Sequence, residues 1–505
     1  MKRIIYALLA LIPMMATSQN MYNVTNLLDN SPVGSARFVA MGGSMGALGG
    51  DVSVMGTNPA GTAIYRSSDF NFTAVMNSIT NTAKFGGNAM PAKYNNANLS
   101  NVGFVIAFET MENPVKYVNI GANVRRKSNF SNNFNVKGAS KGFSQQYIIS
   151  DLYNAGQFDF ERMNSGMYQN LEYDWLALLA ANAGLYDDKG NFIVDSDGKL
   201  LHHPESFDYY SEERGGLDIF DINISMNIDD WVYVGATLGY YNLDYSRFST
   251  YYEVGKKGKI YTLDNEYKIS GSGYDFKFGA IFRPFRYSPF RIGAFVHTPV
   301  FYKLLDRSRA SMIGPNSDGL ETSSEYCYGD DFYTPYSLMT PWKYGASLSY
   351  TFGRYVALNA EYEYADASRT TFTDGADVDL AQNDEIARNL KPQHTVRLGA
   401  EFSWKNLAFR VGYNYITSAF SSNAFKNLSA SSIVDTSTEC MNKFDKKIIT
   451  CGIGYVGKLI YIDLAYMRQQ QNGEFYPCYD FDKANPSATL KSNSHSLYAG
   501  IGFRF

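Results

Sequence analysis

The pentapeptide Gly42-Gly43-Ser44-Met45-Gly46 has the G-x-S-x-G spacing of a nucleophile elbow, in which a serine attacks an ester carbonyl. That chemistry requires a buried strand before the serine, a helix after it, and an aspartate and a histidine from elsewhere in the chain. The preceding residues, 35–40, make a poor central strand inside a glycine-rich tract. Because the motif lacks its structural context, the sequence does not predict an enzyme.

Histidine and cysteine offer little more chemistry. The five histidines show no metal-ligand spacing, so the sequence predicts neither a metal site nor a cofactor; they are His202, His203, His297, His394 and His495. Three cysteines fall in predicted loops and Cys451 falls in a predicted strand; the three are Cys327, Cys440 and Cys478. Sequence alone does not determine whether they pair.

Two arginines, Arg397 and Arg410, occupy inward-facing positions on neighbouring predicted strands. They could bind an anionic head group in the lumen of a barrel. Alternatively, they could simply pair with inward acids such as Glu401, because buried charges are normally paired. The residues themselves leave both interpretations open.

The first eighteen residues have the features of a cleavable secretory signal. Lys2-Arg3 precedes an apolar run over 4–15, and Ala16-Thr17-Ser18 supplies the small residues of a cleavage site. The apolar run is shorter than the roughly 20 residues of a membrane-spanning helix. We therefore expect an exported chain whose residues 1–18 are the signal peptide.

Composition favours many strands over a disulfide-rich secreted fold. The chain has 40 Tyr, 34 Phe and 43 Gly but only 4 Cys, which fits a large β-protein with aromatic residues for membrane interfaces. The net charge of −4, without a basic stripe, argues against a nucleic-acid partner.

Strict alternation of apolar and polar residues marks the predicted strands. Residues 220–228 read Phe-Asp-Ile-Asn-Ile-Ser-Met-Asn-Ile, and similar alternation occurs at 232–240, 396–402, 407–413 and 460–466. Such segments place an apolar face against lipid and a polar face inward. A soluble sandwich also alternates, so the pattern alone does not decide between the two.

The spacing of these segments is more informative. We expect about fourteen strands near 68–84, 98–110, 115–128, 216–229, 231–250, 268–283, 289–308, 337–351, 354–372, 393–404, 407–419, 444–457, 459–470 and 495–505. Short connections at 111–114, 229–230, 283–289, 353–354, 405–406 and 457–458 alternate with long polar ones. This sorting predicts an all-β transmembrane antiparallel barrel of a Gram-negative outer membrane, with both termini in the periplasm. The final strand ends at the aromatic Phe505, as expected for a barrel recognised by the outer-membrane assembly machinery.

Two segments do not fit the strand pattern. Residues 19–64 precede the barrel (65–505) and could fold into its lumen as a hatch, or plug. The longest loop, about 129–215, carries apolar residues at helical spacing: Leu171, Trp175, Leu178, Leu179, Leu185 and Tyr186. We favour a helix that packs on neighbouring loops; alternatively, Trp175, Leu178 and Leu179 form a surface that captures a hydrophobic ligand.

The segments 36–43 and 51–61, which end in Asn58-Pro59-Ala60-Gly61 ahead of the first strand, resemble the FadL/TodX family of outer-membrane transporters. Residues 336–341, 396–401 and 410–413 are also similar to that family, whereas the loop 129–215 is not matched. The resemblance is close over the hatch and looser along the barrel.

This resemblance implies a fourteen-stranded barrel plugged by its N-terminal hatch, which transports long-chain fatty acids or aromatic hydrocarbons passively. The ligand would be captured by external loops and released sideways into the membrane, where the third strand is kinked. Asn58, Pro59, Ala60 and Gly61 would face that opening, and Gly121 is the candidate kink residue, since glycine inside a strand marks a bend or a close approach.

Two other functions stay open. One is a barrel of the type IX secretion shuttle type, which binds exported proteins; the other is a surface adhesin whose working part is the loop 129–215. The sequence does not determine the ligand, the oligomeric state or the role of that loop.

Overall fold

The computed structural model describes residues 21–110, 114–155, 175–185, 204–256, 258–285, 287–315, 321–322, 332–374, 378–380, 382–422, 424–425, 436–478 and 485–505. The signal peptide, Leu171, Tyr186 and Cys327 lie outside these ranges. No helix among the described residues is long and apolar enough to cross a membrane.

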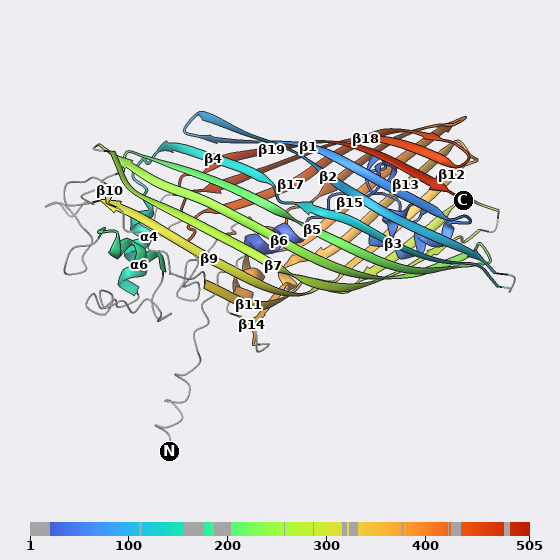
Figure 1. Ribbon diagram of the computed structural model, residues 1–505, viewed down its shortest axis with the longest axis horizontal. Helices are drawn as coiled ribbons and strands as arrows, with labels where there is room; N and C mark the ends of the chain where they lie inside the picture. Colours follow the sequence, from blue (N-terminus) through green and yellow to red (C-terminus); the bar gives the residue numbers. More distant parts are fainter. Residues whose placement is uncertain are drawn as a thin grey trace, which may run out of the picture.

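The described strands form one antiparallel sheet that closes on itself, because β1 pairs with both β2 and β19 (Figure 1). The strands are β1 (Asp69–Phe85), β2 (Asn88–Glu109), β3 (Val115–Asn129), β4 (Asn132–Ala139), β5 (Ser206–Ile228), β6 (Val232–Gly255), β7 (Gly258–Phe282), β8 (Arg291–His297), β9 (Phe301–Pro315), β10 (Glu321–Thr322), β11 (Phe332–Met339), β12 (Lys343–Phe352), β13 (Val356–Asp366), β14 (Thr371–Asp374), β15 (Pro392–Trp404), β16 (Leu407–Ile416), β17 (Cys440–Val456), β18 (Ile460–Tyr476) and β19 (Ala488–Arg504). The all-β barrel predicted from the sequence is confirmed.

Several wall strands contain a short break. β3 and β4 both pair with β5, and β8 and β9 both pair with β7. β11 and β12 follow each other along β9 and β8, and β13 continues into β14. Counted in this way, and with β10 only extending β9, the described strands form the predicted fourteen-stranded wall.

The six predicted short connections lie at one end of the barrel, together with Phe505; we call this the turn end and the opposite end the loop end (Figure 1). The loop end also has short connections, because β1 ends at Phe85 and β2 begins at Asn88, and β6 ends at Gly255 and β7 begins at Gly258. Asp229 and Asp230 both have positive φ, as a tight hairpin turn requires. At the loop end the sequence-based prediction is wrong in part. Residues 88–97 and 251–255, expected to be loop, extend β2 and β6, and the predicted loop 129–215 contains β4 and residues 206–215 of β5. Their polar residues are compatible with strands that continue beyond the membrane, where both faces contact water.

The two faces of β5 show that the wall lies in a membrane. Ile222 and Ile224 point outward and are 47% and 52% exposed, whereas Asp221 and Asn223 point inward and are 0% and 1% exposed. A soluble sandwich would bury the apolar face instead. The outward apolar face therefore needs lipid around it.

Exposed aromatic residues flank this apolar belt at both ends, as in membrane barrels. Near the turn end they are Trp231, Phe282, Phe352, Tyr355, Trp404 and Tyr455, and nearer the loop end they include Tyr240, Tyr274, Trp342, Tyr344 and Tyr413. Tyr240 and Tyr274 are direct cross-strand partners on β6 and β7.

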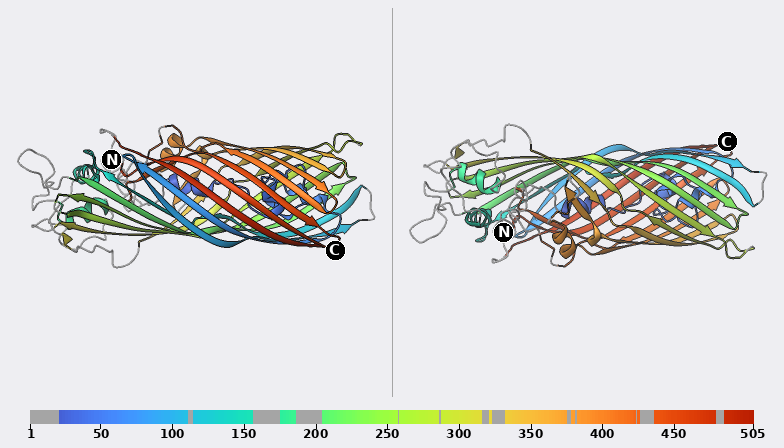
Figure 2. Two further views of the ribbon diagram at one scale, coloured as in Figure 1. Left: turned by 90° about the horizontal axis from the view of Figure 1, so that it is seen from above. Right: turned by 90° about the horizontal axis from the view of Figure 1, so that it is seen from below.

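The segment 21–64, which we call the plug, lies inside the barrel (Figures 1 and 2). It contains α2 (Met21–Leu27), α3 (Ala36–Ala40), η1 (Val52–Gly56) and η2 (Pro59–Ile64). Ser35 caps α3 and Asp51 caps η1, and Ser35 Oγ donates to the Asp51 carboxylate at 2.6 Å. The plug is therefore folded on itself as well as packed on the wall.

The loop end carries a second apolar core. α4 (Gln145–Ala155) and α6 (Trp175–Asn182) pack with the outer ends of β1, β2, β4, β5, β6 and β7. Trp175 and Leu179 are buried there, which contradicts the prediction that they form a ligand-capturing surface. The side chain of Leu178 is not among those that the structure describes. An apolar helical stripe usually packs against its neighbours, and this one does.

Candidate functional site

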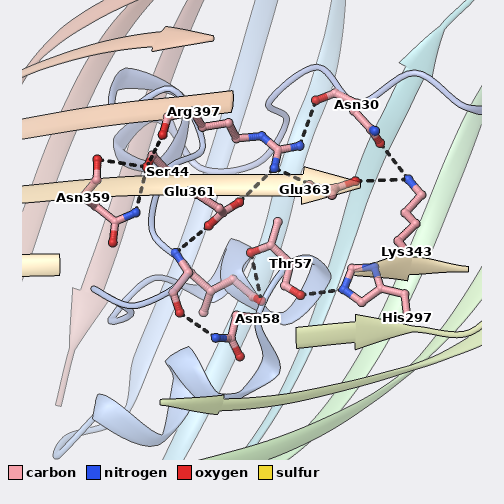
Figure 3. A network of polar contacts seen from close by, with 12 residues as sticks. Asn30, Ser44, Thr57, Asn58, His297, Lys343, Asn359, Glu361, Glu363 and Arg397 are labelled. Atoms are coloured by element: carbon pink, nitrogen blue, oxygen red, sulfur yellow. Dashed lines mark hydrogen bonds and ion pairs between the residues drawn. The ribbon is translucent and has the colours of Figure 1, made fainter. Parts of the chain in front are cut away.

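Asn58 joins the plug to itself and to the wall. Its side-chain amide donates to Gly46 O at 2.7 Å (Figure 3). It also donates to Ala280 O on β7 at 3.4 Å, and the Oδ1 of Asn58 accepts from Ala60 N at 3.2 Å. The last contact is the N-cap of η2, with Pro59 at the first helical position. Asn58 is fully buried, so all its polar contacts are made within the protein.

Inward-facing glycines allow the plug to reach the wall at this point. A Cβ on Gly279 of β7 would overlap Asn58 Oδ1, and one on Gly235 of β6 would lie 2.5 Å from Pro59 C. Gly235 and Gly279 are direct cross-strand partners. The predicted hatch residues Asn58 and Pro59 thus sit in a notch made by glycines on two neighbouring strands.

The end of η2 is fixed by polar side chains of β3 and β5. Thr62 Oγ1 lies 2.6 Å from Asn223 Oδ1 and 2.7 Å from Ser225 Oγ. Asn119 of β3 donates to the carbonyls of Thr62 and Tyr65 at 2.7 and 3.0 Å. Ala60 and Gly61, the other two predicted hatch residues, are buried in this part of the plug.

The opposite side of the plug packs against a second pair of glycines. Gly399 of β15 and Gly412 of β16 are cross-strand partners, and a Cβ on either would meet the plug backbone at Met41 or Gly42. Ser44, the serine of the G-x-S-x-G motif, is buried here and accepts from Asn359 Nδ2 at 2.7 Å. It follows a turn rather than a strand, so the elbow geometry is absent.

A charged network links the plug to β12, β13 and β15 (Figure 3). Arg397 Nη1 donates to Glu361 Oε1 at 2.8 Å and to Glu363 Oε2 at 2.9 Å. Its Nη2 donates to Asn30 O in the plug at 3.2 Å, and Glu361 accepts from Gly46 N at 2.9 Å. His297 Nε2 also lies 2.6 Å from Thr57 O.

A second network surrounds Arg410. Its guanidinium donates to Glu401 Oε2 and to Asp463 Oδ1, both at 2.6 Å. Arg37 of the plug also binds Glu401, at 3.1 and 3.3 Å. Burial lowers the pKa of Arg37, but the Glu401 carboxylate, together with Asp51 and Asp463, raises it above its ordinary value. Arg397 and Arg410 are thus paired with acids and hold the plug, which contradicts their prediction as head-group ligands.

Gly121 lies on β3 opposite Met55, whose Cε occupies the space of a Cβ at that position. The ladders from β3 to β2 and to β5 run through Gly121 without a shift. The β3–β5 ladder is irregular instead between Val115 and Tyr117 and between Arg126 and Ser128. The glycine therefore admits the plug, and the opening in the wall begins further along the strand.

That opening is a gap between β2 and β3. β2 pairs with β3 only from Asn101, opposite Arg125, to Glu109, opposite Tyr117. From Asn101 toward the loop end, residues 88–100 of β2 have β1 as their only partner strand. On the other side, the paired residues within 126–139 have β5 as their only partner strand. Across this break in the ladder, the side chain of Asn81 on β1 donates to Asn132 Oδ1 and to Asn133 O on β4. Further out, Lys137 N contacts Met90 Sδ at 3.2 Å, so the two edges meet again at the loop end.

A cavity of about 290 Å³ lies behind this wall gap. Its lining includes Asn98, Leu99 and Ser100 of β2 and Arg126, Lys127 and Ser128 of β3, with residues of the plug, β1 and β16–β19 completing it. A smaller cavity of about 70 Å³ lies between the plug and the wall and shares Asp29, Ser31, Val33 and Lys127 with the first. The wall gap thus opens onto the space directly above the plug.

Three lysines reach this space. Lys446 donates to Asp29 Oδ1 at 2.8 Å and to Ser31 Oγ at 3.2 Å. Burial raises the pKa of Asp29, but Lys446 and the Ser31 hydrogen bonds lower it further, to about 2. Lys443 donates to Asn26 Oδ1 at 2.9 Å and Lys127 to Leu27 O at 3.2 Å, both near the end of α2. Cations at a helix C-terminus are favourable.

Sequence reasoning missed the wall gap and the lysines. Asn98, Ser100 and Lys127 fall in or beside predicted strands, but nothing local shows that β2 and β3 separate there. Among the described residues, Cys451 is a free cysteine. Cys451 faces outward, and Cys440 and Cys478 are buried.

No protein-family model and no curated protein matches the sequence. Among solved structures, the chain is similar to a Pseudomonas aeruginosa FadL homologue, with 11% identity, a TM-score of 0.55, and coverage of 94% of this chain and 99% of that one. It is also similar to the Pseudomonas putida toluene transporter TodX, with 12% identity, a TM-score of 0.49, and coverage of 93% and 97%. The first of these likenesses, over nearly the whole of both chains, shows that this chain has the fold of the FadL homologue: a fourteen-stranded barrel preceded by an N-terminal segment.

Proposed function

We propose that this protein is a passive outer-membrane channel for hydrophobic compounds, with long-chain fatty acids as the first candidates. The observation that carries the proposal is the wall gap between β2 and β3, with a cavity behind it and a plug below it. Such an arrangement gives a ligand from the loop end a sideways route into the membrane.

The plug closes the straight route. Buried charged networks and two glycine notches fix it to strands on several sides of the lumen. A ligand above the plug therefore meets the wall gap before it meets a path along the barrel axis. Hydrophobic compounds partition into lipid favourably, so sideways release needs no energy source.

The wall gap lies at the edge of the apolar belt. Leu99 on β2 and Val124 on β3 point outward and are 44% and 41% exposed. In our proposal the turn end faces the periplasm and the loop end faces outside, as in barrels with short periplasmic turns. The gap then opens toward the outer part of the membrane.

The hatch residues set the position of the plug in this scheme. Asn58 ties Gly46 to β7, and Thr62 ties η2 to β5. We propose that loosening these contacts lets ligand pass from the cavity into the wall gap. Asn58, Pro59, Ala60 and Gly61 are thus gating residues that need not contact the ligand.

Uptake of labelled oleate tests the proposal, in cells lacking the gene and complemented with wild-type protein or variants. Wild-type protein is expected to restore uptake. Ser128→Trp, which fills the wall gap, is expected to reduce it strongly. Val124→Trp, on the same strand but facing lipid, is the matched control and should restore uptake fully.

Two outcomes would overturn the proposal: no dependence of uptake on the gene when the barrel is properly assembled, or full uptake with Ser128→Trp. Barrel assembly is checked by resistance to unfolding in unheated SDS. Recovery of exported proteins with the barrel in a pull-down would instead favour the secretion-shuttle alternative.

A further inference from the structure

We propose that the outer surface of the barrel carries a binding site for an anionic phospholipid at the turn end. Arg354 and Lys405 bind its phosphate, and a groove further along the same strands holds an acyl chain. The site goes beyond the proposed function, because it lies on the lipid-facing surface and outside the route of a transported ligand. Our proposed orientation of the barrel places this site in the periplasmic leaflet.

The groove lies on the outer face of β12, β13, β15 and β16 and has a volume of about 580 Å³. Ala360 of β13 and Ala400 of β15 give it depth, because each is flanked across the strands by larger apolar residues. The cross-strand pairs are Leu348–Ala360, Ala360–Leu398, Leu358–Ala400 and Ala400–Val411. The lining also includes Phe290, Tyr350 and Tyr413. The two alanines thus leave a hollow in a surface of bulky apolar side chains.

Each of the two hairpins that form the groove carries one cation at its turn. The turn between β12 and β13 contains Arg354, and the turn between β15 and β16 contains Lys405. These turns are adjacent, because Ser403 N, beside the second turn, donates to Tyr355 O, beside the first, at 2.6 Å. Two positive charges therefore lie on neighbouring turns at the end of one groove.

Both cations are exposed, and neither has an acidic partner among the residues that the structure describes. Arg354 lies over the ring of Tyr355, 5.4 Å from its centroid, and Lys405 lies over the ring of Trp404, at 5.2 Å. A cation on an aromatic face keeps N–H donors for a further partner. The two aromatic residues are exposed and belong to the belt near the turn end, so the cations stand at the level of lipid head groups.

The acids of these strands near the turn end do not cancel the two charges. Glu361 and Glu401 point into the lumen, where they pair with Arg397 and Arg410. All the described residues that line the groove are uncharged. The outer surface therefore has an excess of about two positive charges here, one from each turn.

The distance between the turns and the groove suits a phospholipid. Six residues separate Arg354 from Ala360, which is about 20 Å along a strand that rises about 3.3 Å per residue. A tilt of about 40° places Ala360 about 15 Å deep, which is half of the hydrocarbon core. An acyl chain of one leaflet therefore reaches the groove when its head group lies at the turns.

The two cations favour a phospholipid with a net negative charge. Arginine and lysine both bind phosphate, and arginine can do so with two parallel hydrogen bonds. A zwitterionic lipid brings a cation of its own beside the phosphate, so it matches two unpaired cations less well. Free phosphate has no chain for the groove. Phosphatidylglycerol is therefore the probe of choice, and phosphatidylcholine is its matched comparison.

Quenching of tryptophan fluorescence by brominated phospholipids tests this inference in reconstituted vesicles. The chain has four tryptophans. Trp404 lies at the site, whereas Trp231 follows the acidic turn Asp229-Asp230 on another part of the wall. Two proteins are compared, one that retains only Trp404 and one that retains only Trp231, with phenylalanine at the other tryptophan positions. Phosphatidylcholine vesicles contain increasing fractions of either brominated phosphatidylglycerol or brominated phosphatidylcholine.

Trp404 should report a preference of at least about threefold for phosphatidylglycerol, since each basic residue near the surface attracts anionic lipid. Trp231 should report no preference. Equal quenching of Trp404 by the two lipids would overturn the site. The same preference at both tryptophans would show a general attraction of the barrel for anionic lipid, and would also overturn it.

Variants separate the contributions of the cations and the groove. Arg354→Gln/Lys405→Gln should abolish the preference at Trp404, whereas Lys116→Gln, which removes a turn-end cation already paired with acids, should leave it unchanged. Ala360→Phe fills the groove and should also lower the preference. Ala499→Phe, on the lipid-facing side of β19, is its matched control.

A wild-type preference in the glutamine double variant would overturn the role of the cations. A wild-type preference in Ala360→Phe would overturn the groove as the site of the acyl chain. Barrel assembly of every variant is checked by resistance to unfolding in unheated SDS. Oleate uptake by cells reports separately on the proposed function, so the two can fail independently.

Discussion

Asn58 and Gly279 face each other across the boundary between plug and wall, and the missing Cβ of the glycine makes room for the amide of the asparagine. On one side of this contact Asn58 caps η2; on the other, β7 continues without interruption. The plug is thus seated by shape as well as by charge. A substitution at Gly279 can therefore change the position of the plug in the lumen without altering any charge or any lipid-facing residue.

Gly279→Ala should displace the plug. The added methyl group overlaps Asn58 Oδ1, and overpacking of this kind costs about 1–3 kcal/mol. Single-channel conductance in planar bilayers should then show leak openings that the wild-type protein lacks. Ala280→Leu, the neighbouring residue on the lipid-facing side, is the control and should stay closed. A closed Gly279→Ala channel would show that the notch is not needed for seating.

Asn58→Ala should loosen the plug while the barrel stays folded. Loss of an N-cap side chain typically costs about 1 kcal/mol, and this variant also loses the bond to Gly46. Asn58→Asp keeps the capping oxygen but buries a carboxylate without a cation, with an oxygen against Gly46 O, so its effect should be larger. Oleate uptake and protease sensitivity of the plug are the measurements. Unchanged uptake by well-folded Asn58→Ala protein would remove this residue from the gating scheme.

The sequence was sufficient to predict the wall because lipid and lumen impose opposite chemistry on alternate residues. Ile222 and Asp221 are neighbours in sequence, yet one faces lipid and the other is fully buried. The alternation stops at Asp229-Asp230, so the same pattern also located this hairpin turn at the turn end. It failed for 88–97, 206–215 and 251–255, since strands outside the membrane lose the alternation that identifies them.

The site was predictable only in part because its contacts join distant segments. The Asn58-Pro59-Ala60-Gly61 motif marked the hatch, but its glycine notch requires knowledge of which strand faces the plug. The pairing of Arg397 with Glu361 and Glu363 likewise depends on strand register. The wall gap is the absence of a ladder, and no pattern within β2 or β3 predicts an absent partner.

The Asp29–Lys446 contact should make docking of α2 dependent on pH. The pKa of Asp29 in the folded protein is about 2, below its ordinary value of 3.8. A lowered pKa stabilises the folded state fully above the ordinary value and is lost as pH falls through the folded one. Docking should therefore be constant down to about pH 4 and weaken between pH 4 and 2.

A cysteine introduced at Val24, on buried α2, in a background without native cysteines would report on this docking. Its labelling by a thiol reagent that reacts at low pH should rise between pH 4 and 2. Lys446→Met removes the cation and should shift the rise to higher pH. Labelling that is independent of pH in this range would exclude Asp29 as the titrating group.

Arg397→Met should be among the more destabilising single changes at the plug. The guanidinium is shared by Glu361 and Glu363, both buried, so its loss leaves Glu361 without a cation and Glu363 with Lys343 alone, at 3.7 Å. Removing one partner of a buried pair costs about 3–5 kcal/mol, mostly because of the charge left behind. The triple variant Arg397→Met/Glu361→Gln/Glu363→Gln removes those charges too and should recover much of the loss. Urea unfolding in lipid vesicles, followed by tryptophan fluorescence, measures both. Lys116→Met, in a partly exposed pair at the turn end, should change the midpoint little. If Arg397→Met were as mild as Lys116→Met, the network would not be holding the plug against β13 and β15.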